Sequence, residues 1–190
     1  MKRIFLILLT VAALFLFASC NTTKPDVSNT NTDSTVEIPK PNQEVLFVIT
    51  RTNFSDDIYF SGSIIDSNGN YHYLPNNFSF EDENWYQIAL DAQKSQAANS
   101  VKETDLNTIY KFISEFNANE SYNTITYDEY IPDYGSITLY EIYSGANNKM
   151  AYKKLCEYGE SISCLDDETV KDFVNWMTDN NYFFISDFKY

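Results

Sequence analysis

The apolar stretch EVLFVITR, residues 44–51, is the segment around which the rest of the fold can be arranged. Val45, Phe47 and Ile49 are apolar, and so are the positions between them. Because successive side chains of a strand point to opposite faces, a strand with this pattern is apolar on both of them. The stretch therefore predicts a central strand that is covered on two faces.

The next two strand candidates form a hairpin. Residues 58–65, IYFSGSII, and residues 71–74, YHYL, are separated by the polar run DSNGN, residues 66–70. Within that run, Asn68-Gly69 supplies the positive φ angles that a two-residue primed turn requires. We expect the two strands to pair through this turn.

The rest of the chain shows helical and strand patterns in alternation. Apolar residues recur at helical spacing in 81–97, again after Thr104, which we expect to cap the second helix, and from Asp166 or Asp167 to Asp179. Further strand candidates are 121–127, 136–143 and 150–156, and the closing segment 182–190 either adds an edge strand or docks on the core. This order predicts an α+β fold, a largely antiparallel sheet of about five to six strands with about three helices gathered on one side.

The N-terminus follows a different pattern. A positively charged start at residues 1–3 precedes an apolar run over 4–17, and Ala18-Ser19-Cys20 follows. This order resembles a bacterial lipoprotein signal peptide with its lipobox. The resemblance implies that residues 1–19 are removed and that Cys20 becomes a lipidated N-terminus, with acyl chains such as palmitate.

Two alternatives remain for this segment: a plain secretory signal peptide and an uncleaved membrane helix. The apolar run 4–17 is shorter than the roughly 20 residues that a membrane-spanning helix needs, and Thr10 interrupts it. Two acyl chains anchor a protein stably, whereas one chain binds only marginally. We therefore expect a protein held at the cell membrane by a lipid on Cys20, on the extracytoplasmic side.

A polar linker follows the lipidated cysteine. Residues 21–42 are punctuated by prolines and show no apolar periodicity. Such a segment has too little apolar area to offset the entropy of ordering it, so we expect residues 20–42 to be a lipidated, disordered tether. As a flexible coil it spans roughly 25 Å. Residues 43–190 then form a single globular extracytoplasmic domain.

The predicted mature chain is strongly acidic. Removal of residues 1–19 takes away Lys2 and Arg3 and no acidic residue, which leaves 11 basic and 27 acidic residues and a net charge of −16. Phosphate backbones and anionic lipid headgroups repel such a domain, because neutralising phosphates requires clustered Lys or Arg. We expect no nucleic-acid partner and a domain that stays away from the bilayer surface.

Besides Cys20, the chain contains Cys156 and Cys164. An even pair outside the cytoplasm favours a disulfide, and Gly159 lies in the short loop that would let the two residues approach each other. The alternative is two buried thiols that pack as small apolar groups. Two cysteines and one histidine are too few for a structural zinc site, and we expect no metal and no cofactor.

His72 lies between two tyrosines in the returning strand of the hairpin, which makes it a candidate general base. No nucleophile motif of the Gly-x-Ser-x-Gly kind accompanies it, so we interpret it as an exposed or half-buried strand histidine and predict no catalytic residue. Residues 66–70 lack the later glutamate of an EF-hand loop, and the turn explains them. Calcium at Asp56-Asp57 or in the loop 127–135 stays an alternative.

The loop 127–135, YDEYIPDYG, is the best candidate for a binding surface. Tyrosines offer rigid stacking area and a hydroxyl, and neighbouring carboxylates accept hydrogen bonds. The candidate binding residues are Tyr127, Asp128, Glu129, Tyr130, Asp133 and Tyr134. The alternative is a solvated connection whose tyrosines cover the core.

Several turn residues of the domain resemble those of small, uncharacterised lipoproteins of low-GC Gram-positive bacteria. They are Arg51-Thr52-Asn53, Gly62, the run IDSNGN at 65–70, and Asp133-Tyr134-Gly135 before a strand. This resemblance implies a location and a fold, and it implies no activity.

The sequence favours a membrane-anchored surface lipoprotein whose non-catalytic domain binds a protein or glycan ligand. One alternative is an extracellular carboxylate-dependent hydrolase, acting for example on glycans, and another is an anchored inhibitor or immunity protein that meets a cationic toxin. A cleft with two convergent carboxyls of perturbed pKa favours the enzyme, whereas an open aromatic patch favours binding. The sequence decides neither the ligand nor the oligomeric state.

Replacement of the lipidated residue tests the anchor. A Cys20→Ala variant should leave the domain folded and release it into the medium, because the acyl chains are its expected attachment to the membrane. Immunoblots of the membrane and medium fractions measure this release. A variant that stays with the membrane fraction contradicts the lipoprotein interpretation.

Overall fold

Strand β1 (Val45–Asn53) lies in the interior of the sheet, where it pairs antiparallel with β2 (Tyr59–Asp66) and β6 (Ser136–Ser144). The computed structural model describes residues 38–53, 59–118, 124–127, 135–159 and 162–182. Val45 to Ile49 are at most 2% exposed, so both faces of this strand are covered. The prediction of a central strand covered on two faces is confirmed.

Over the described residues the sheet has eight strands, and every neighbouring pair is antiparallel. Their order is β4-β3-β2-β1-β6-β7-β8-β5. The remaining strands are β3 (Asn70–Tyr73), β4 (Asn99–Ser100), β5 (Thr124–Tyr127), β7 (Met150–Tyr158) and β8 (Ile162–Leu165). The fold is α+β as predicted, with more strands than expected. The sequence pattern missed β4 and β8 because two and four residues are too few to show a period.

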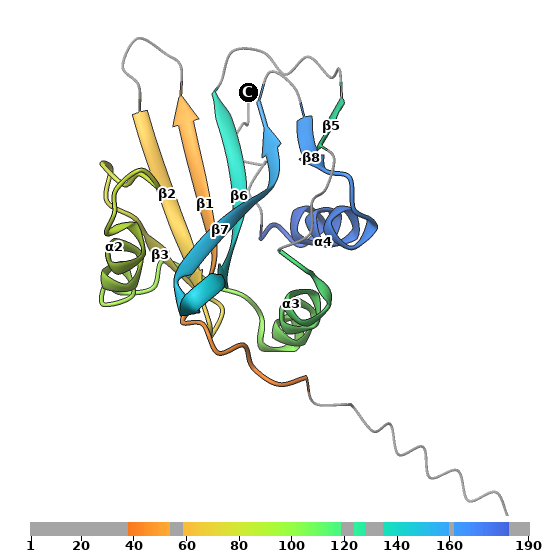
Figure 1. The fold of residues 1–190 in the computed structure, drawn as a ribbon, viewed down its shortest axis with the longest axis horizontal. Helices are drawn as coiled ribbons and strands as arrows, with labels where there is room; N and C mark the ends of the chain where they lie inside the picture. Colours follow the sequence, from red (N-terminus) through yellow and green to blue (C-terminus); the bar gives the residue numbers. More distant parts are fainter. Residues whose placement is uncertain (1–37, 54–58, 119–123, 128–134, 160–161, 183–190) are drawn as a thin grey trace, which may run out of the picture. The chain divides into compact units, whose positions relative to one another are not determined.

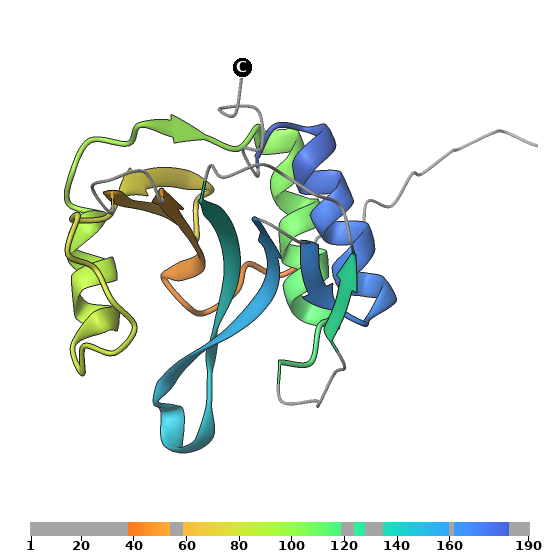
Figure 2. The same cartoon turned by 90° about the horizontal axis from the view of Figure 1, so that it is seen from above.

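Three helices pack on the sheet, and a 3-10 turn joins β6 to β7. Among the described residues the helices are α2 (Trp85–Ala92), α3 (Glu103–Glu115) and α4 (Glu168–Asp179), and the turn is η1 (Ala146–Asn148). Figures 1 and 2 show α3 and α4 side by side and α2 apart from them. Among the described residues, no helix is both long enough and apolar enough to cross a membrane.

The helices cover both faces of the sheet rather than one. In the larger core, α3 and α4 pack with Leu46, Phe47 and Ile49 of β1. In the smaller core, α2 packs with Val45 and Val48. The expectation that the helices gather on one side is wrong, because a strand that is apolar on two faces needs a layer against each of them.

A β-bulge at Leu46 decides which residues of β1 share a face. Val45 pairs with Asp66 and Phe47 pairs with Ile65, which leaves Leu46 as the extra residue. Leu46 and Phe47 therefore enter the same core although they are adjacent in sequence. Simple alternation would place them on opposite faces.

The β2–β3 hairpin closes through a three-residue turn rather than the predicted two-residue primed turn. The Gly69 N–H donates to the Asp66 carbonyl oxygen at 2.9 Å, and Gly69 has a φ of 79°, whereas Asn68 is not among the described residues with positive φ. The Asp66 carboxylate accepts hydrogen bonds from the backbone N–H groups of Asn68 and Asn70, both at 2.8 Å. This side chain holds the turn, so one left-handed residue is enough to close it.

A tertiary contact decides how α3 begins. Lys102 is the N-cap residue and Thr104 lies within the first turn, so the predicted Thr104 cap is wrong. The Tyr182 hydroxyl accepts a hydrogen bond from the Lys102 N–H at 3.0 Å and donates to the Asp105 carboxylate at 2.6 Å. A residue far along the chain thus links the N–H of the N-cap residue to a carboxylate of the first turn, and no N-cap side chain bonds to the helix.

A disulfide joins Cys156 of β7 to Cys164 of β8, and the two residues are register partners in the sheet. Both are buried, at 0% and 7% exposure. After β8, Asp167 begins α4 as predicted, because its carboxylate accepts a hydrogen bond from the Val170 N–H at 3.0 Å. The disulfide and the cap fix the passage from the sheet into the last helix.

Part of the segment that the sequence assigns to the tether contacts the domain. Ile38 packs against the larger core, and the Lys40 Nζ atom donates to the Asn68 Oδ1 atom at 2.5 Å. All of the described residues belong to one unit of the chain, Glu37–Tyr190. Residues 1–37, with the predicted signal peptide and Cys20, lie outside the described part, as do residues 183–190 of the closing segment.

Glu141 of β6 is a buried carboxylic acid. It lies opposite Phe47 in one ladder and opposite Lys153 in the other, and it is 2% exposed. Its Oε2 atom has no hydrogen-bond partner among the described residues. Burial raises the pKa of this carboxyl to about 8, against a smaller opposing effect of the Lys153 ammonium group. The folded protein therefore keeps Glu141 protonated at neutral pH.

The raised pKa of Glu141 makes stability depend on pH. An unfolded chain loses this proton near pH 4.5, whereas the folded protein holds it until about pH 8, so the free energy of unfolding falls as the pH rises between these values. A Glu141→Gln variant has no titrating carboxyl at this position, so its free energy of unfolding does not show this decrease. Between about pH 5 and about pH 8.5, the wild type should lose on the order of 3 kcal/mol relative to the variant.

Urea unfolding of the wild type and of Glu141→Gln at both pH values measures this difference. The other titrating groups are common to the two proteins and cancel in the comparison. A stability difference that is the same at both pH values contradicts the assignment of a raised pKa to Glu141.

The turn residue Gly69 should not tolerate a side chain. A Cβ atom at this position would lie 2.5 Å from the Leu106 Cδ2 atom and 3.1 Å from the Val101 Cβ atom, at a φ that L-residues rarely adopt. Gly69→Ala should therefore lower the free energy of unfolding by roughly 2 to 3 kcal/mol. Thermal unfolding measures the loss, with Ser67→Ala in the same turn as the control.

The double variant Gly69→Ala/Leu106→Ala separates the two causes. Removal of the Leu106 side chain relieves the overlap but leaves the backbone strain, so the two substitutions should be less destabilising together than the sum of their separate effects. Additive losses would show that the side-chain overlap is not a cause.

Candidate functional site

A groove of about 460 Å³ opens on the face of the sheet that carries α2. Strands β1, β6 and β7 and the segment between β3 and α2 supply its walls. The lining residues are Thr50, Thr52, Phe78, Ser79, Phe80, Glu81, Ser136, Thr138, Tyr140, Tyr152 and Glu157. Its volume lies within the range of about 300 to 1,000 Å³ that is usual for small-molecule sites.

Hydroxyl side chains form the part of the groove made by β1 and β6. Thr50 pairs with Thr138 and Thr52 pairs with Ser136, so two neighbouring cross-strand pairs carry four hydroxyls. The Thr52 and Ser136 hydroxyls lie 2.8 Å apart and bond to each other. The period of two along each strand places these residues on one face.

The Tyr140 hydroxyl belongs to the same set. Burial raises the pKa of this phenol above its ordinary value, against smaller opposing effects of the neighbouring Thr138 and Thr50 side chains. Tyr140 is therefore neutral, and a neutral hydroxyl both donates and accepts hydrogen bonds.

Aromatic side chains form the opposite part of the groove. The Phe80 ring stacks on the Tyr152 ring at 4.0 Å between centroids and contacts the rings of Tyr140 and Trp85 at 4.7 and 5.2 Å. Tyr152 is 41% exposed, whereas Phe78, at the start of the same segment, is buried at 4%. Phe78 thus anchors the segment, and Tyr152 presents a supported aromatic surface to solvent.

A β-bulge in β7 brings Tyr152 and Glu157 onto the groove face. Leu139 pairs with Cys156 and Tyr140 pairs with Lys154, so Leu155 is an extra residue. Residues five positions apart in a regular strand point to opposite faces, and the extra residue reverses this relation. The groove therefore depends on the bulge.

The charged residues of the groove are acidic. Glu81 and Glu157 line it, and no lysine or arginine is among the lining residues that the structure describes. Lys154 lies nearby and binds Glu157, with its Nζ atom 2.7 Å from the carboxylate oxygen. The groove therefore suits neutral or cationic groups better than anionic ones.

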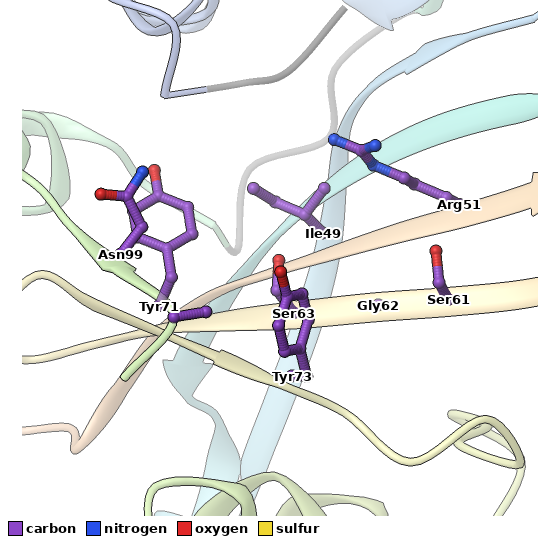
Figure 3. A pocket seen from close by; sticks show the side chains of 9 residues that line it. Ile49, Arg51, Ser61, Gly62, Ser63, Tyr71, Tyr73 and Asn99 are labelled. Carbon is purple, nitrogen blue, oxygen red and sulfur yellow. The ribbon is translucent and has the colours of Figure 1, made fainter. Parts of the chain in front are cut away.

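A second, smaller pocket of about 240 Å³ lies on the other face of the sheet, over β1, β2, β3 and β4, so that it shares only β1 with the groove (Figure 3). Figure 3 shows the side chains of Arg51 and Tyr71 at its two ends, with Ile49 between them. The Tyr71 hydroxyl donates to the Tyr182 carbonyl oxygen at 2.9 Å, and burial raises the pKa of this phenol well above its usual range. Tyr73, also in the lining, is 73% exposed.

His72 is buried, so the expectation of an exposed or half-buried strand histidine is wrong. It is 5% exposed, with its Nε2 atom 3.3 Å from the Asp66 carboxylate and its Nδ1 atom 3.1 Å from the Ser95 carbonyl oxygen. Both ring nitrogens thus face acceptors that hold the hairpin and the end of α2 together. No described nucleophile bonds to it, and the disulfide commits both Cys156 and Cys164.

The predicted binding loop falls largely outside the described residues. Asp128, Glu129, Tyr130, Asp133 and Tyr134 lie there, and Tyr127 is the last residue of β5. Asp56 and Asp57, the other candidate calcium position, also lie outside the described residues. In the part of the chain that the structure describes, no group of three or more His, Cys, Asp or Glu side chains is placed to hold a metal ion.

The sequence analysis missed the groove itself. Its residues come from four separate segments, and no single segment contains more than four of them. One local signal was available, because Thr50 and Thr52 alternate directly after the apolar half of β1. Such a change from apolar to hydroxyl residues within one strand marks the place where the covering layer ends.

In comparisons with protein-family models, with curated proteins and with solved structures, none matches this chain.

Proposed function

We propose that the protein is a lipid-anchored surface protein whose groove captures a ligand without chemically changing it. The observation that carries this proposal is the open aromatic surface at Tyr152, supported by Phe80 and set beside a row of hydroxyls. A supported aromatic ring with nearby hydrogen-bonding groups is a typical binding surface. The lipid on Cys20 and the tether place this surface outside the membrane.

The carboxyl groups of the domain favour binding over hydrolysis. Glycosidases use two carboxyls about 5 to 10 Å apart across the scissile bond, one of them protonated. Two carboxyls, Glu81 and Glu157, line the groove, and Glu157 is bound to Lys154 at 2.7 Å. The carboxyl that keeps its proton, Glu141, lies on the opposite face of β6 from the groove residue Tyr140 and is buried at 2% exposure. These placements support a binding role.

Trp85 is a reporter for the groove. Its ring lies 5.5 Å from the Tyr152 ring and 5.2 Å from the Phe80 ring. The chain has two tryptophans, and Trp176→Phe leaves Trp85 as the only one. Phenylalanine keeps an aromatic ring against Phe173, so this substitution should preserve the fold.

The soluble Cys20→Ala/Trp176→Phe protein is titrated with two separate pools from the cell envelope, wall glycan and secreted proteins. One pool should change the Trp85 fluorescence until the change saturates. The component of that pool that binds should be recovered unmodified. Tyr152→Ala should weaken this binding at least about tenfold, because a central aromatic contact contributes more than about 1.4 kcal/mol.

Tyr73→Ala is the matched control, because Tyr73 is the more exposed tyrosine and lines the pocket on the other face. It should leave the affinity unchanged. Capture by the groove is contradicted if neither pool changes the Trp85 fluorescence. It is also contradicted if Tyr152→Ala and Tyr73→Ala weaken the affinity equally, or if the bound material is cleaved.

A further inference from the structure

The hydroxyl-bearing part of the groove matches one ligand chemistry. Thr50, Thr138 and Tyr140 line the groove with three hydroxyls, and the Thr52 and Ser136 hydroxyls form a bonded pair at 2.8 Å beside them. A hydroxyl both donates and accepts hydrogen bonds, so a row of them can pair with a ligand whose own polar groups are hydroxyls. Sugars are such ligands, with several hydroxyls on each ring.

The aromatic part of the groove matches the other side of a sugar ring. Tyr152 is stacked by Phe80 at 4.0 Å and contacted edge-on by Trp85 at 5.5 Å, so its ring is held in place before a ligand arrives. A sugar presents C–H groups on one face, and these pack on an aromatic ring at little cost in conformational entropy when the ring is already ordered. Stacking and hydroxyl pairing thus act on two sides of one ligand.

The charges of the groove select against anionic ligands. Its charged lining residues are Glu81 and Glu157, and the nearby Lys154 is bound to Glu157 at 2.7 Å. A phosphate or carboxylate in the groove would meet like charges and no described cationic lining residue. These charges leave neutral and cationic ligands, and the row of hydroxyls favours the neutral ones, because uncharged hydroxyls pair with it directly.

The backbone of the groove selects against an added peptide strand. The floor belongs to β1, β6 and β7, and each of these strands is paired on both sides within the sheet. Peptides that extend a sheet need an unpaired edge, and none is available at this floor. Recognition here depends on side chains alone.

We propose that the groove binds a neutral glycan chain, with one sugar ring packed on Tyr152 and the hydroxyls of the neighbouring sugars paired with the lining hydroxyls. Thr50 and Thr138 are the buried part of this lining, at 8% and 4% exposure, whereas Thr52 and Ser136 are partly exposed. This inference rests on the proposed function, because it names the ligand class of the same groove. Binding needs no cofactor and changes no covalent bond.

The test uses defined oligosaccharides and the Trp85 reporter described above. The neutral probes are the β-1,4-linked tetramers of N-acetylglucosamine and of glucose, and the anionic probe is tetragalacturonate. At least one neutral tetramer should bind with a Kd between about 10 μM and about 1 mM, a range usual for a small preformed site. Its affinity should not change with salt concentration, because the ligand carries no charge.

Three variants separate the contributions of the groove. Tyr152→Ala should weaken the binding of the neutral tetramer at least tenfold, whereas Tyr152→Phe, which keeps the ring, should stay within about threefold of the starting protein. Thr138→Val keeps the volume and removes one hydroxyl, so it should weaken binding about three- to tenfold. Unchanged thermal unfolding of Tyr152→Phe and Thr138→Val shows that these effects are not losses of fold.

The outcomes distinguish the two proposals. If the secreted-protein pool binds at Tyr152 and neither neutral tetramer does, the glycan inference is overturned and capture by the groove stands. Preference for tetragalacturonate overturns the inference as well. If neither the pools nor the tetramers bind, both proposals are overturned, and loss of tetramer binding in Tyr73→Ala would place the sugar on the other face.

Discussion

The burial of β1 on both faces is the constraint on which the rest of this structure depends. Phe47 stacks on Phe173 of α4 at 5.3 Å, and Phe173 stacks in turn on Phe112 of α3 at 3.9 Å. On the other face, Val48 packs in the core that α2 completes. Each large side chain buried in this way contributes about 1.5 to 3 kcal/mol, so elements far apart in the sequence are held against one strand.

The same strand lines two concave surfaces of the domain, one on each face of the sheet. After Ile49 its residues become polar, because neither helix layer extends over this end of the strand. Thr50 and Thr52 then line the aromatic groove on one face, and Arg51 lines the smaller pocket on the other. The apolar half of β1 is therefore buried in the two cores, and its polar half lines the groove of the proposed function.

The strength of local patterns separates what could be predicted from what could not. The β2–β3 hairpin and the Asp167 cap of α4 were predictable because their signals lie within a few residues. The Thr104 cap was wrong because Tyr182, far along the chain, links the N–H of the N-cap residue to a carboxylate of the first turn. The groove was out of reach for the same reason, since Tyr152 and Glu157 share a face only through the bulge at Leu155.

By itself, the sequence determined the α+β class, the central strand, the hairpin and the amphipathic helices. These features follow from periods of two and 3.6 residues inside single segments. Only the tertiary structure decided that helices cover both faces of the sheet, that Leu46 and Leu155 are bulged, and that an aromatic surface faces a row of hydroxyls. The physical reason is that register and the sharing of a face depend on pairing between distant strands, and a shift of one residue moves every later side chain to the opposite face.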